Sequence, residues 1–165
     1  MNVVGRLEGI HDIGTSLLAF NNDGDTLASI GMDDLNTLCI HNWRKNIQIL
    51  RTPTSKNKIL CACFLQRRQH LQLGVPDEAT GSSATGGGPS ANQDILVTGG
   101  YRFLKFWWWQ GQNVQSQSAI WAGHKREKKS MILSVASGSP GVCVTGASNG
   151  SILLWKDFKV SETFS

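Results

Sequence analysis

The stretch from Gly123-His124 to Trp155 decides the fold, because it holds three short strand patterns separated by turns. The strand patterns are Met131-Ile-Leu-Ser-Val-Ala136, Val142-Cys-Val-Thr145 and Ser151-Ile-Leu-Leu-Trp155, and the turns are residues 137–141 and 147–150. Apolar side chains fall on both alternating faces of the third strand, so the predicted sheet needs cover on both sides. No nearby segment has a helical apolar period, which leaves a second sheet as the expected cover.

The spacing of this stretch is that of a propeller blade, a repeated unit of four strands. Trp155 follows His124 by thirty-one residues. The same order of strands and turns occurs twice more upstream. The expected blades are residues 9–51, residues 52–121 and a truncated blade at 122–165, and residues 1–8 are either the outer strand of a preceding blade or a start peptide.

The middle blade is interrupted between its first two strands by a low-complexity insert, residues 66–93. It includes Gly81-Ser-Ser-Ala-Thr-Gly-Gly-Gly-Pro-Ser90, a composition with too little apolar surface to order itself. We expect a flexible loop that leaves the blade intact.

The fold class predicted from these repeats is all-β, with about three four-stranded propeller blades in an incomplete propeller. A closed propeller contains at least four blades. We therefore expect the chain to be part of a longer protein, a truncated gene product, or a module that another chain completes.

Composition limits the possible functions. The chain has 165 residues, of which 40% are hydrophobic, and a formal net charge of +4. It has no apolar run of the roughly 18 residues that a membrane span requires, and its first residues lack a signal core. A soluble, intracellular protein is the expectation, with no membrane or nucleic-acid partner.

The four cysteines are expected to be reduced and structural. Cys39, Cys61, Cys63 and Cys143 lie in apolar strand patterns without the spacing of a zinc knuckle or redox pair. Cys61 and Cys63 share a strand face, where thiols behave as small hydrophobic groups.

The repeats resemble the WD-repeat family, in which a His, a Ser or Thr, an Asp and a Trp form a hydrogen-bonded group in each blade. The resemblance assigns this structural network to seven residues, which are His124, Thr145, Asn149 and Trp155 in the third blade and His11, Ser29 and Asp33 in the first. In the first blade the Trp position falls on His41. Asn149 and Lys156 stand where the family has Asp, which weakens the network because an amide accepts a weaker hydrogen bond than a carboxylate.

A narrower resemblance rests on Met32-Asp-Asp-Leu-Asn36, on Leu104-Lys-Phe-Trp107 followed by Gly111, and on Val144-Thr-Gly-Ala-Ser-Asn-Gly150. In this order they are similar to consecutive blades in the first propeller of the echinoderm microtubule-associated protein-like family. The resemblance implies a cytoplasmic, cytoskeletal protein whose partners are other proteins, including tubulin or microtubules, and the remaining blades of a longer propeller.

Two groups of residues allow more than one interpretation. Trp107-Trp-Trp109 suits a doubly buried strand better than a stacking platform, because alternation sends Trp108 to the opposite face. The basic residues Lys125, Arg126, Lys128 and Lys129 are candidates for binding an acidic partner, and the alternative is a solvated loop.

No catalytic motif is present, so we expect no enzyme activity, no catalytic or metal-binding residues and no cofactor. The predicted function is protein binding through blade loops. Two forms of it stay open: a propeller fragment that contributes to tubulin or microtubule binding, and a generic WD-repeat scaffold without tubulin binding.

Overall fold

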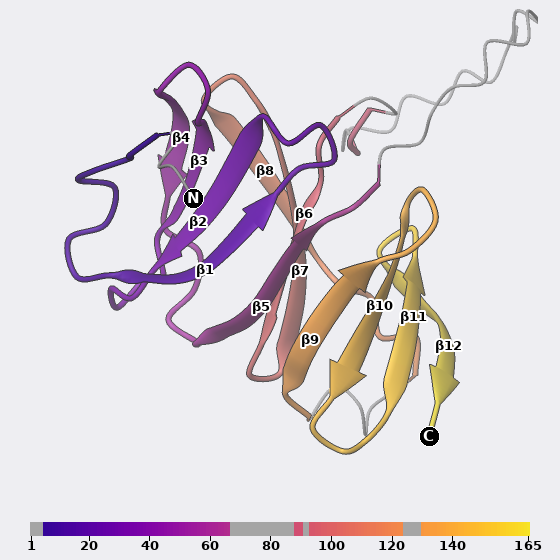
Figure 1. Cartoon of the computed structure of the whole chain (residues 1–165). Coiled ribbons are helices and arrows are strands. Elements are labelled where there is room, and N and C mark those ends of the chain that lie inside the picture. Colours follow the sequence, from indigo (N-terminus) through magenta and orange to yellow (C-terminus); the bar gives the residue numbers. More distant parts are fainter. Residues whose placement is uncertain (1–4, 67–87, 91–92, 124–129) are drawn as a thin grey trace, which may run out of the picture.

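The structure is a computed structural model, and it describes residues 5–66, 88–90, 93–123 and 130–165. These residues form three antiparallel sheets of four strands each, with no helix among them (Figure 1). The first sheet contains β1 (Thr15–Phe20), β2 (Thr26–Gly31), β3 (Leu38–Asn42) and β4 (Ile47–Thr52). The second contains β5 (Ile59–Phe64), β6 (Leu96–Gly100), β7 (Phe103–Gln110) and β8 (Asn113–Ser118). The third contains β9 (Ile132–Ser137), β10 (Val142–Ala147), β11 (Ile152–Lys156) and β12 (Lys159–Phe164).

Each sheet is a meander in which the strands pair in chain order. This arrangement confirms the predicted all-β fold of three propeller blades. Although the sequence predicts a truncated blade at the C-terminus, the third sheet has four strands like the others. Residues 5–14, at the start of the described part of the chain, form no strand.

The sheets stack face to face through two apolar cores. The first core joins sheets one and two and contains Ile30 and Ile40 against Leu96 and Trp107. The second core joins sheets two and three, with members including Leu104, Phe106, Ile132, Leu153 and Trp155. The C-terminal sheet is thus covered by another sheet, as predicted. This cover lies on one side only, whereas the sequence predicted cover on both sides.

The innermost strands β1, β5 and β9 lie next to one another across the stack (Figure 1). Polar contacts join the blades near the ends of these strands. The side chain of Asn22 donates to the carbonyl of Leu65 over 3.0 Å, and the backbone N–H of Gln66 donates to Ser137 Oγ over 2.9 Å. Each blade is therefore fixed to the next by hydrogen bonds as well as by apolar packing.

The turn between β11 and β12 contributes to the second core. Asp157 and Phe158 form this two-residue turn with positive φ angles of 50° and 64°, the conformation that suits a tight hairpin. It directs the ring of Phe158 against β7, with its centroid 4.9 Å from that of Phe106 and 5.8 Å from that of Trp108. Packing across the two blades offsets the strain of a left-handed Phe backbone.

The side chains of the Trp107-Trp-Trp109 segment point alternately to the two faces of sheet two, as expected for a strand that is covered on both faces. Trp107 belongs to the core with sheet one, and Trp109 packs against that core, whereas Trp108 belongs to the core with sheet three. Core packing, and not a stacking platform, accounts for this segment.

The stack does not close on itself, since sheet one and sheet three each pack on sheet two alone. Their outer faces keep large apolar side chains exposed, including Leu18 and Phe20 on sheet one and Ile152 and Phe164 on sheet three. The described chain is an incomplete propeller.

Candidate functional site: blade polar groups and open faces

The polar centre of the third blade is a hydrogen bond between Trp155 and Thr145. The indole Nε1 donates to Thr145 Oγ1 over 2.8 Å, and both side chains are buried in the core with sheet two. Strand pairing explains the contact, because Trp155 lies opposite Cys143 and so shares a face with Thr145 two residues further along β10. The bond gives the indole N–H the partner that a buried donor requires.

The second blade contains the same pair, which was not predicted from the sequence. Trp107 Nε1 donates to Thr98 Oγ1 over 2.9 Å, with Trp107 opposite Leu96 in the register. The signal was available in the sequence, since Thr98 precedes Trp107 by nearly the same spacing that separates Thr145 from Trp155. The insert in this blade obscured the repeat.

In the first blade the corresponding position is occupied by His41, as the sequence indicated. His41 lies opposite Leu27, so it shares a face with Ser29, and both are buried. Its Nε2 is buried with no hydrogen-bond partner among the described residues. Burial, and then the neighbouring His11, lower the pKa of His41 below its usual 6.5.

His11 and Ser29, two members of the expected network, meet directly. A hydrogen bond of 2.9 Å joins His11 Nε2 to Ser29 Oγ, whereas His11 Nδ1 is buried without a partner in the described chain. Burial and then the charge of Arg51 lower the pKa of His11. This imidazole is therefore a neutral structural group at neutral pH.

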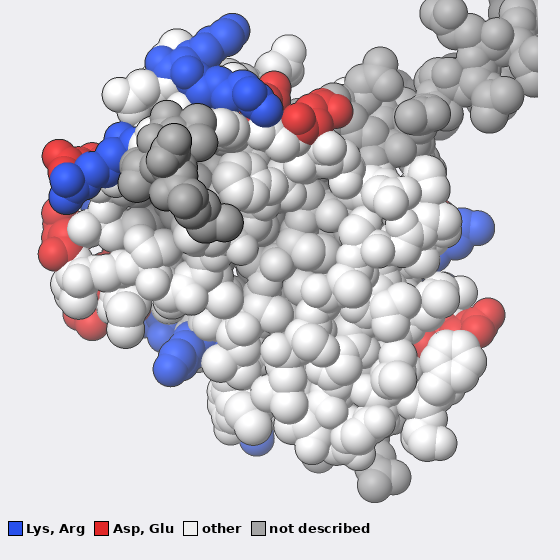
Figure 2. Space-filling model, in the orientation of Figure 1, with Lys and Arg blue, Asp and Glu red and all other residues white. Residues whose placement is uncertain are grey.

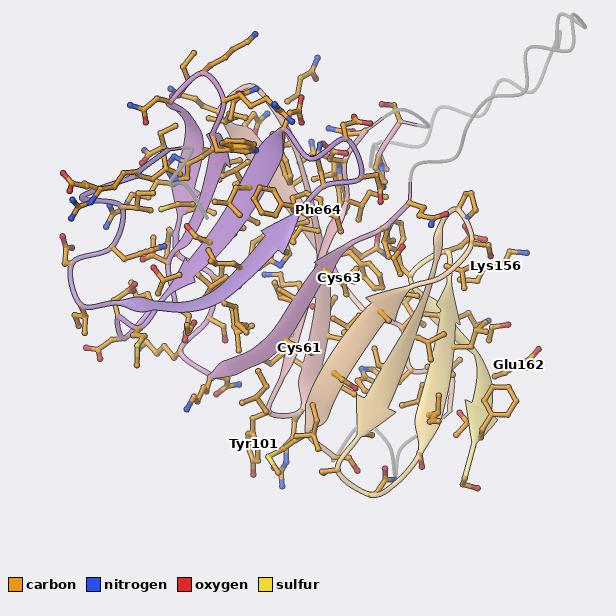
Figure 3. The ribbon with its side chains drawn as sticks, in the orientation of Figure 1. Cys61, Cys63, Phe64, Tyr101, Lys156 and Glu162 are labelled. Atoms are coloured by element: carbon orange, nitrogen blue, oxygen red, sulfur yellow. The ribbon has the colours of Figure 1, made fainter. Side chains whose placement is uncertain are left out.

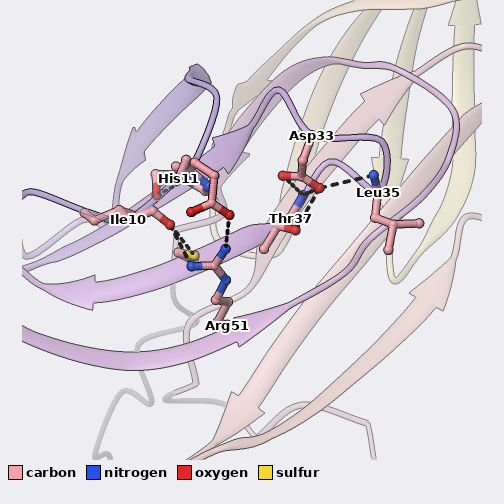
Figure 4. Close-up of polar contacts among 9 residues, drawn as sticks. Ile10, His11, Asp33, Leu35, Thr37 and Arg51 are labelled. Atoms are coloured by element: carbon pink, nitrogen blue, oxygen red, sulfur yellow. Dashed lines mark hydrogen bonds and ion pairs between the residues drawn. The ribbon is translucent and has the colours of Figure 1, made fainter.

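Asp33, the third expected member, instead organises its own turn. Its carboxylate accepts hydrogen bonds from the backbone N–H groups of Leu35 and Thr37 and from Thr37 Oγ1 at 2.9–3.2 Å (Figure 4). Burial acts to raise the pKa of Asp33, but the hydrogen bonds from Thr37 and Leu35 outweigh it, and the pKa is lowered. No hydrogen bond joins Asp33 to His11 among the described contacts.

The segment before β1 is tied to the outer strands of the first sheet. The carbonyl of Ile10 accepts from Arg51 Nη1 over 3.0 Å and from the thiol of Cys39, and Arg51 lies 3.6 Å from Asp12 (Figure 4). These contacts hold His11 over Ser29. Partly exposed ion pairs such as Arg51–Asp12 contribute little by themselves.

Of the remaining network residues of the third blade, the structure describes Asn149 alone. Asn149 is exposed, and its side-chain oxygen accepts from the backbone N–H of Ser151 over 3.2 Å. His124 lies outside the described residues, as do the candidate partner-binding residues Lys125, Arg126, Lys128 and Lys129. Most of the insert, residues 67–87 and 91–92, lies outside them too.

The four cysteines are free thiols, and all but Cys39 pack in the core between sheets two and three. Cys39, Cys61 and Cys143 are buried, and Cys63 is half-buried. Figure 3 shows Cys61 and Cys63 on the same strand, and both pack in the core with sheet three. Burial raises the pKa of Cys61 to about 11 and that of Cys63 to about 12, so both thiols are protonated at neutral pH. Across the described residues, no group of three or more His, Cys, Asp or Glu is arranged to hold a metal ion.

Two hollows lie at the faces of the blades. One, of about 300 Å³, lies between sheets two and three and is lined in part by Ile95, Phe106 and Trp155. The other, of about 870 Å³, lies on the outer face of sheet one, where Leu18, Phe20, Leu27 and Ser29 form its floor. The larger hollow belongs to a blade face that no sheet covers.

Charged side chains gather away from the middle of the stack. In the view of Figure 2, lysines, arginines and carboxylates lie around the edge, and the surface over β5 and β9 is free of described charges. Within the described part of the chain, no helix is long and apolar enough to cross a membrane.

Comparison with known proteins relates the chain to two groups. The RRP9 WD40 repeats match with a TM-score of 0.53 and 16% identity, over 84% of this chain and 32% of that chain. U3-55K matches with a TM-score of 0.53 and 15% identity, over 84% of this chain and 33% of that one. These structures establish the fold: the chain is an incomplete WD-type β-propeller.

The sequence relatives are microtubule-associated proteins. Human echinoderm microtubule-associated protein-like 1 is 23% identical over 157 residues, which cover 94% of this chain and 16% of the relative. The 77 kDa echinoderm microtubule-associated protein of Lytechinus variegatus is 24% identical over 157 residues, or 94% of this chain and 19% of the relative. No protein-family model matches the chain. The protein is a WD-repeat chain that resembles the echinoderm microtubule-associated protein-like proteins, and it spans less than a fifth of their length.

Proposed function

We propose that the chain is a non-enzymatic propeller segment of a cytoskeletal protein and that it contributes to binding tubulin or microtubules. The observation that carries the proposal is the match to microtubule-associated proteins over 94% of the chain. Cytoplasmic, cytoskeletal localisation and protein partners follow from the same proposal. Blades that complete the propeller, supplied by a longer chain or by another chain, are among those partners.

The described polar groups support a scaffold rather than a reaction centre. Trp107 and Trp155 use their N–H groups to join neighbouring strands, and Asp33 closes a turn. Each group therefore has a structural partner in the blade. WD-type blades supply rigid sheets on which loops present binding residues.

The basic cluster Lys125, Arg126, Lys128 and Lys129 is the binding element that we propose. Four positive charges within five residues suit an acidic protein surface, and such attraction weakens as salt shortens the Debye length from ~10 Å at 0.1 M to ~3 Å at 1 M. The blade loops of a propeller are the natural place for such a cluster.

Cosedimentation with microtubules tests the proposal. Replacing the four cluster residues by Glu should reduce binding severalfold, and binding by the parent chain should fall as salt rises. A matched control reverses four exposed basic residues elsewhere, Arg44, Lys45, Lys56 and Lys58, so that both variants have the same net charge. Both must keep the circular dichroism of the parent.

The outcomes separate the two forms of the function. Loss of binding in the cluster variant alone supports a specific microtubule-binding loop, and equal loss in both variants indicates attraction by net charge only. If the parent chain does not cosediment at low salt, the tubulin-binding proposal fails, and a scaffold for other proteins is the better description.

A further inference from the structure

Three equivalent apolar positions show which blade faces the chain leaves uncovered. Leu38, Leu104 and Ile152 each lie three residues before the position of His41, Trp107 or Trp155 in the third strand of their sheets. Leu38 is 0% exposed and Leu104 is 1% exposed, because the next blade packs on each of them. Ile152 is 48% exposed, because no blade of the described chain packs on it.

The uncovered side of sheet three forms a continuous apolar surface, which we name the Leu154 face. Strand pairing places Leu154 beside Val144, and Ile152 beside Phe164. Lys156 and Glu162 belong to the same side and are exposed (Figure 3). An apolar centre with a charged margin is the pattern of a protein interface.

The uncovered side of sheet one is the side of a blade that packs on the preceding blade, whereas the Leu154 face is the side that packs on the following blade. Pairing places Leu18 beside Ser29, and Phe20 beside Leu27 and then His41. We name this side the Ser29 face. It corresponds to the Trp107 side of sheet two and the Trp155 side of sheet three, each of which packs on the preceding blade. Leu18 is 63% exposed and Phe20 is 55% exposed.

The segment before β1 lies against sheet one in the way that the segment before β9 lies against sheet three. In the third blade, Trp121 packs edge-on against Trp155 with ring centroids 5.0 Å apart, and Ile120 bridges to β12, while sheet two covers the same face. In the first blade, Ile10 is bonded to Arg51 of β4, and His11 to Ser29. The Ser29 face is therefore arranged to receive a blade with its connecting segment already in place.

We propose that the Ser29 face of one copy of this chain packs on the Leu154 face of a second copy. The two blade contacts within the chain show which side of a blade packs on which, and a second copy supplies the missing side in both places. The new contact is head-to-tail, since the two faces differ. It repeats the packing of Ile40 and Leu38 on the Trp107 side of sheet two.

Two copies joined in this way close into a ring. Three blades from each copy make six, which lies within the roughly four to eight blades of known propellers. Closure buries both pairs of faces, and so removes the four exposed apolar surfaces that two separate copies present to water. An open chain of copies always leaves one face exposed at each end.

Analytical ultracentrifugation of the full chain tests the proposal. The expected particle has twice the 18.0 kDa mass of one chain. Leu18→Glu on the Ser29 face and Ile152→Glu on the Leu154 face should each reduce self-association at least tenfold, because each places a charge in both interfaces of the ring. Tyr101→Glu is the matched control, since Tyr101 is exposed and lies between β6 and β7 of sheet two, which carries neither the Ser29 face nor the Leu154 face.

Mixing the two variants distinguishes head-to-tail from like-to-like packing. An equimolar mixture of Leu18→Glu and Ile152→Glu retains one unaltered interface, so a mixed dimer should form where neither variant dimerises alone. A like-to-like dimer would instead survive in one of the single variants, and that result overturns the proposal. A parent chain that stays monomeric, or one that grows into particles of unlimited size, also overturns it. Circular dichroism checks that each variant is folded, and Phe164→Glu provides a second charge on the Leu154 face.

Discussion

Trp155 donates its indole N–H to Thr145 across neighbouring strands, and the pair lies where the third blade packs on the second. The same relationship joins Trp107 to Thr98 in the second blade. In each case one bulky ring fills the contact between two sheets, and a short hydrogen bond fixes its orientation. The Trp and Thr side chains are thus a repeated device for stacking blades.

Replacing Trp155 by Ala should therefore lower the free energy of unfolding by about 3–5 kcal/mol, since it empties a buried aromatic site. Chemical denaturation of parent and variant measures the loss. Trp43→Ala is a suitable control, because Trp43 is only half-buried and packs at its edge on Phe20. A loss at Trp155 below about 1 kcal/mol would mean that the ring is not in the blade contact.

Gly99 permits the close approach of the second and third blades. A Cβ at this position would lie 2.7 Å from Ile132 Cγ2 and 2.9 Å from Cys61 Sγ. Gly99→Ala should destabilise the chain by about 1–3 kcal/mol through overpacking. Gly138→Ala is the matched control, because its added Cβ has no neighbour nearer than 3.7 Å. Equal denaturation midpoints for the two variants would contradict the close contact.

Stability should rise with pH across the range in which His11 and His41 titrate. Their folded-state pKa values lie below 6.5, so the unfolded chain binds protons more readily. The stability that these neutral side chains contribute is fully present above the pKa of the unfolded chain. It is lost as the pH falls from that pKa toward the lower pKa values of the folded chain. The free energy of unfolding should thus be larger at about pH 8 than at about pH 5.5. The double variant His11→Asn/His41→Asn should show a smaller difference, and an unchanged difference would argue against two neutral, buried imidazoles.

Thiol reactivity should be low in the folded chain. Cys61 and Cys63 have pKa values of about 11 and 12, and burial also raises the pKa of Cys39 and Cys143, so few thiolates form near pH 8. A disulfide reagent should react slowly with native protein and with all four cysteines after unfolding. Rapid reaction of the native chain would contradict the buried positions.

The sequence predicted most of the fold because apolar alternation marks the strands that are covered. The predicted strand patterns at residues 131–136, 142–145 and 151–155 correspond to β9, β10 and β11, and their ends differ from the observed ones by at most two residues. β12, the outer strand of the same blade, was not predicted, and like the outer strand β8 (Asn113-Val-Gln-Ser-Gln-Ser118) it has a largely polar sequence that lacks an apolar signal. Their position at the sheet edge leaves them exposed, so burial imposes no pattern on them.

The polar groups were harder to predict, because hydrogen bonds depend on register and side-chain direction. Thr145 and Trp155 were assigned from the family resemblance, and pairing in the sheet brings them into contact. Asp33 was expected to join His11, but its carboxylate is closer to the N–H groups of its own turn and bonds there. Short-range contacts of this kind compete with a network that sequence spacing alone suggests.

Three separate blades stack face to face in one chain, and contacts between aromatic rings test this arrangement most directly. Nuclear Overhauser measurements on the full chain should detect proximity between Phe158 of the third blade and Phe106 of the second, whose ring centroids are 4.9 Å apart. This contact should persist on dilution, because it lies within one chain. If Phe158 shows no contact with Phe106 or Trp108 while both sheets are folded, the stacked arrangement is wrong.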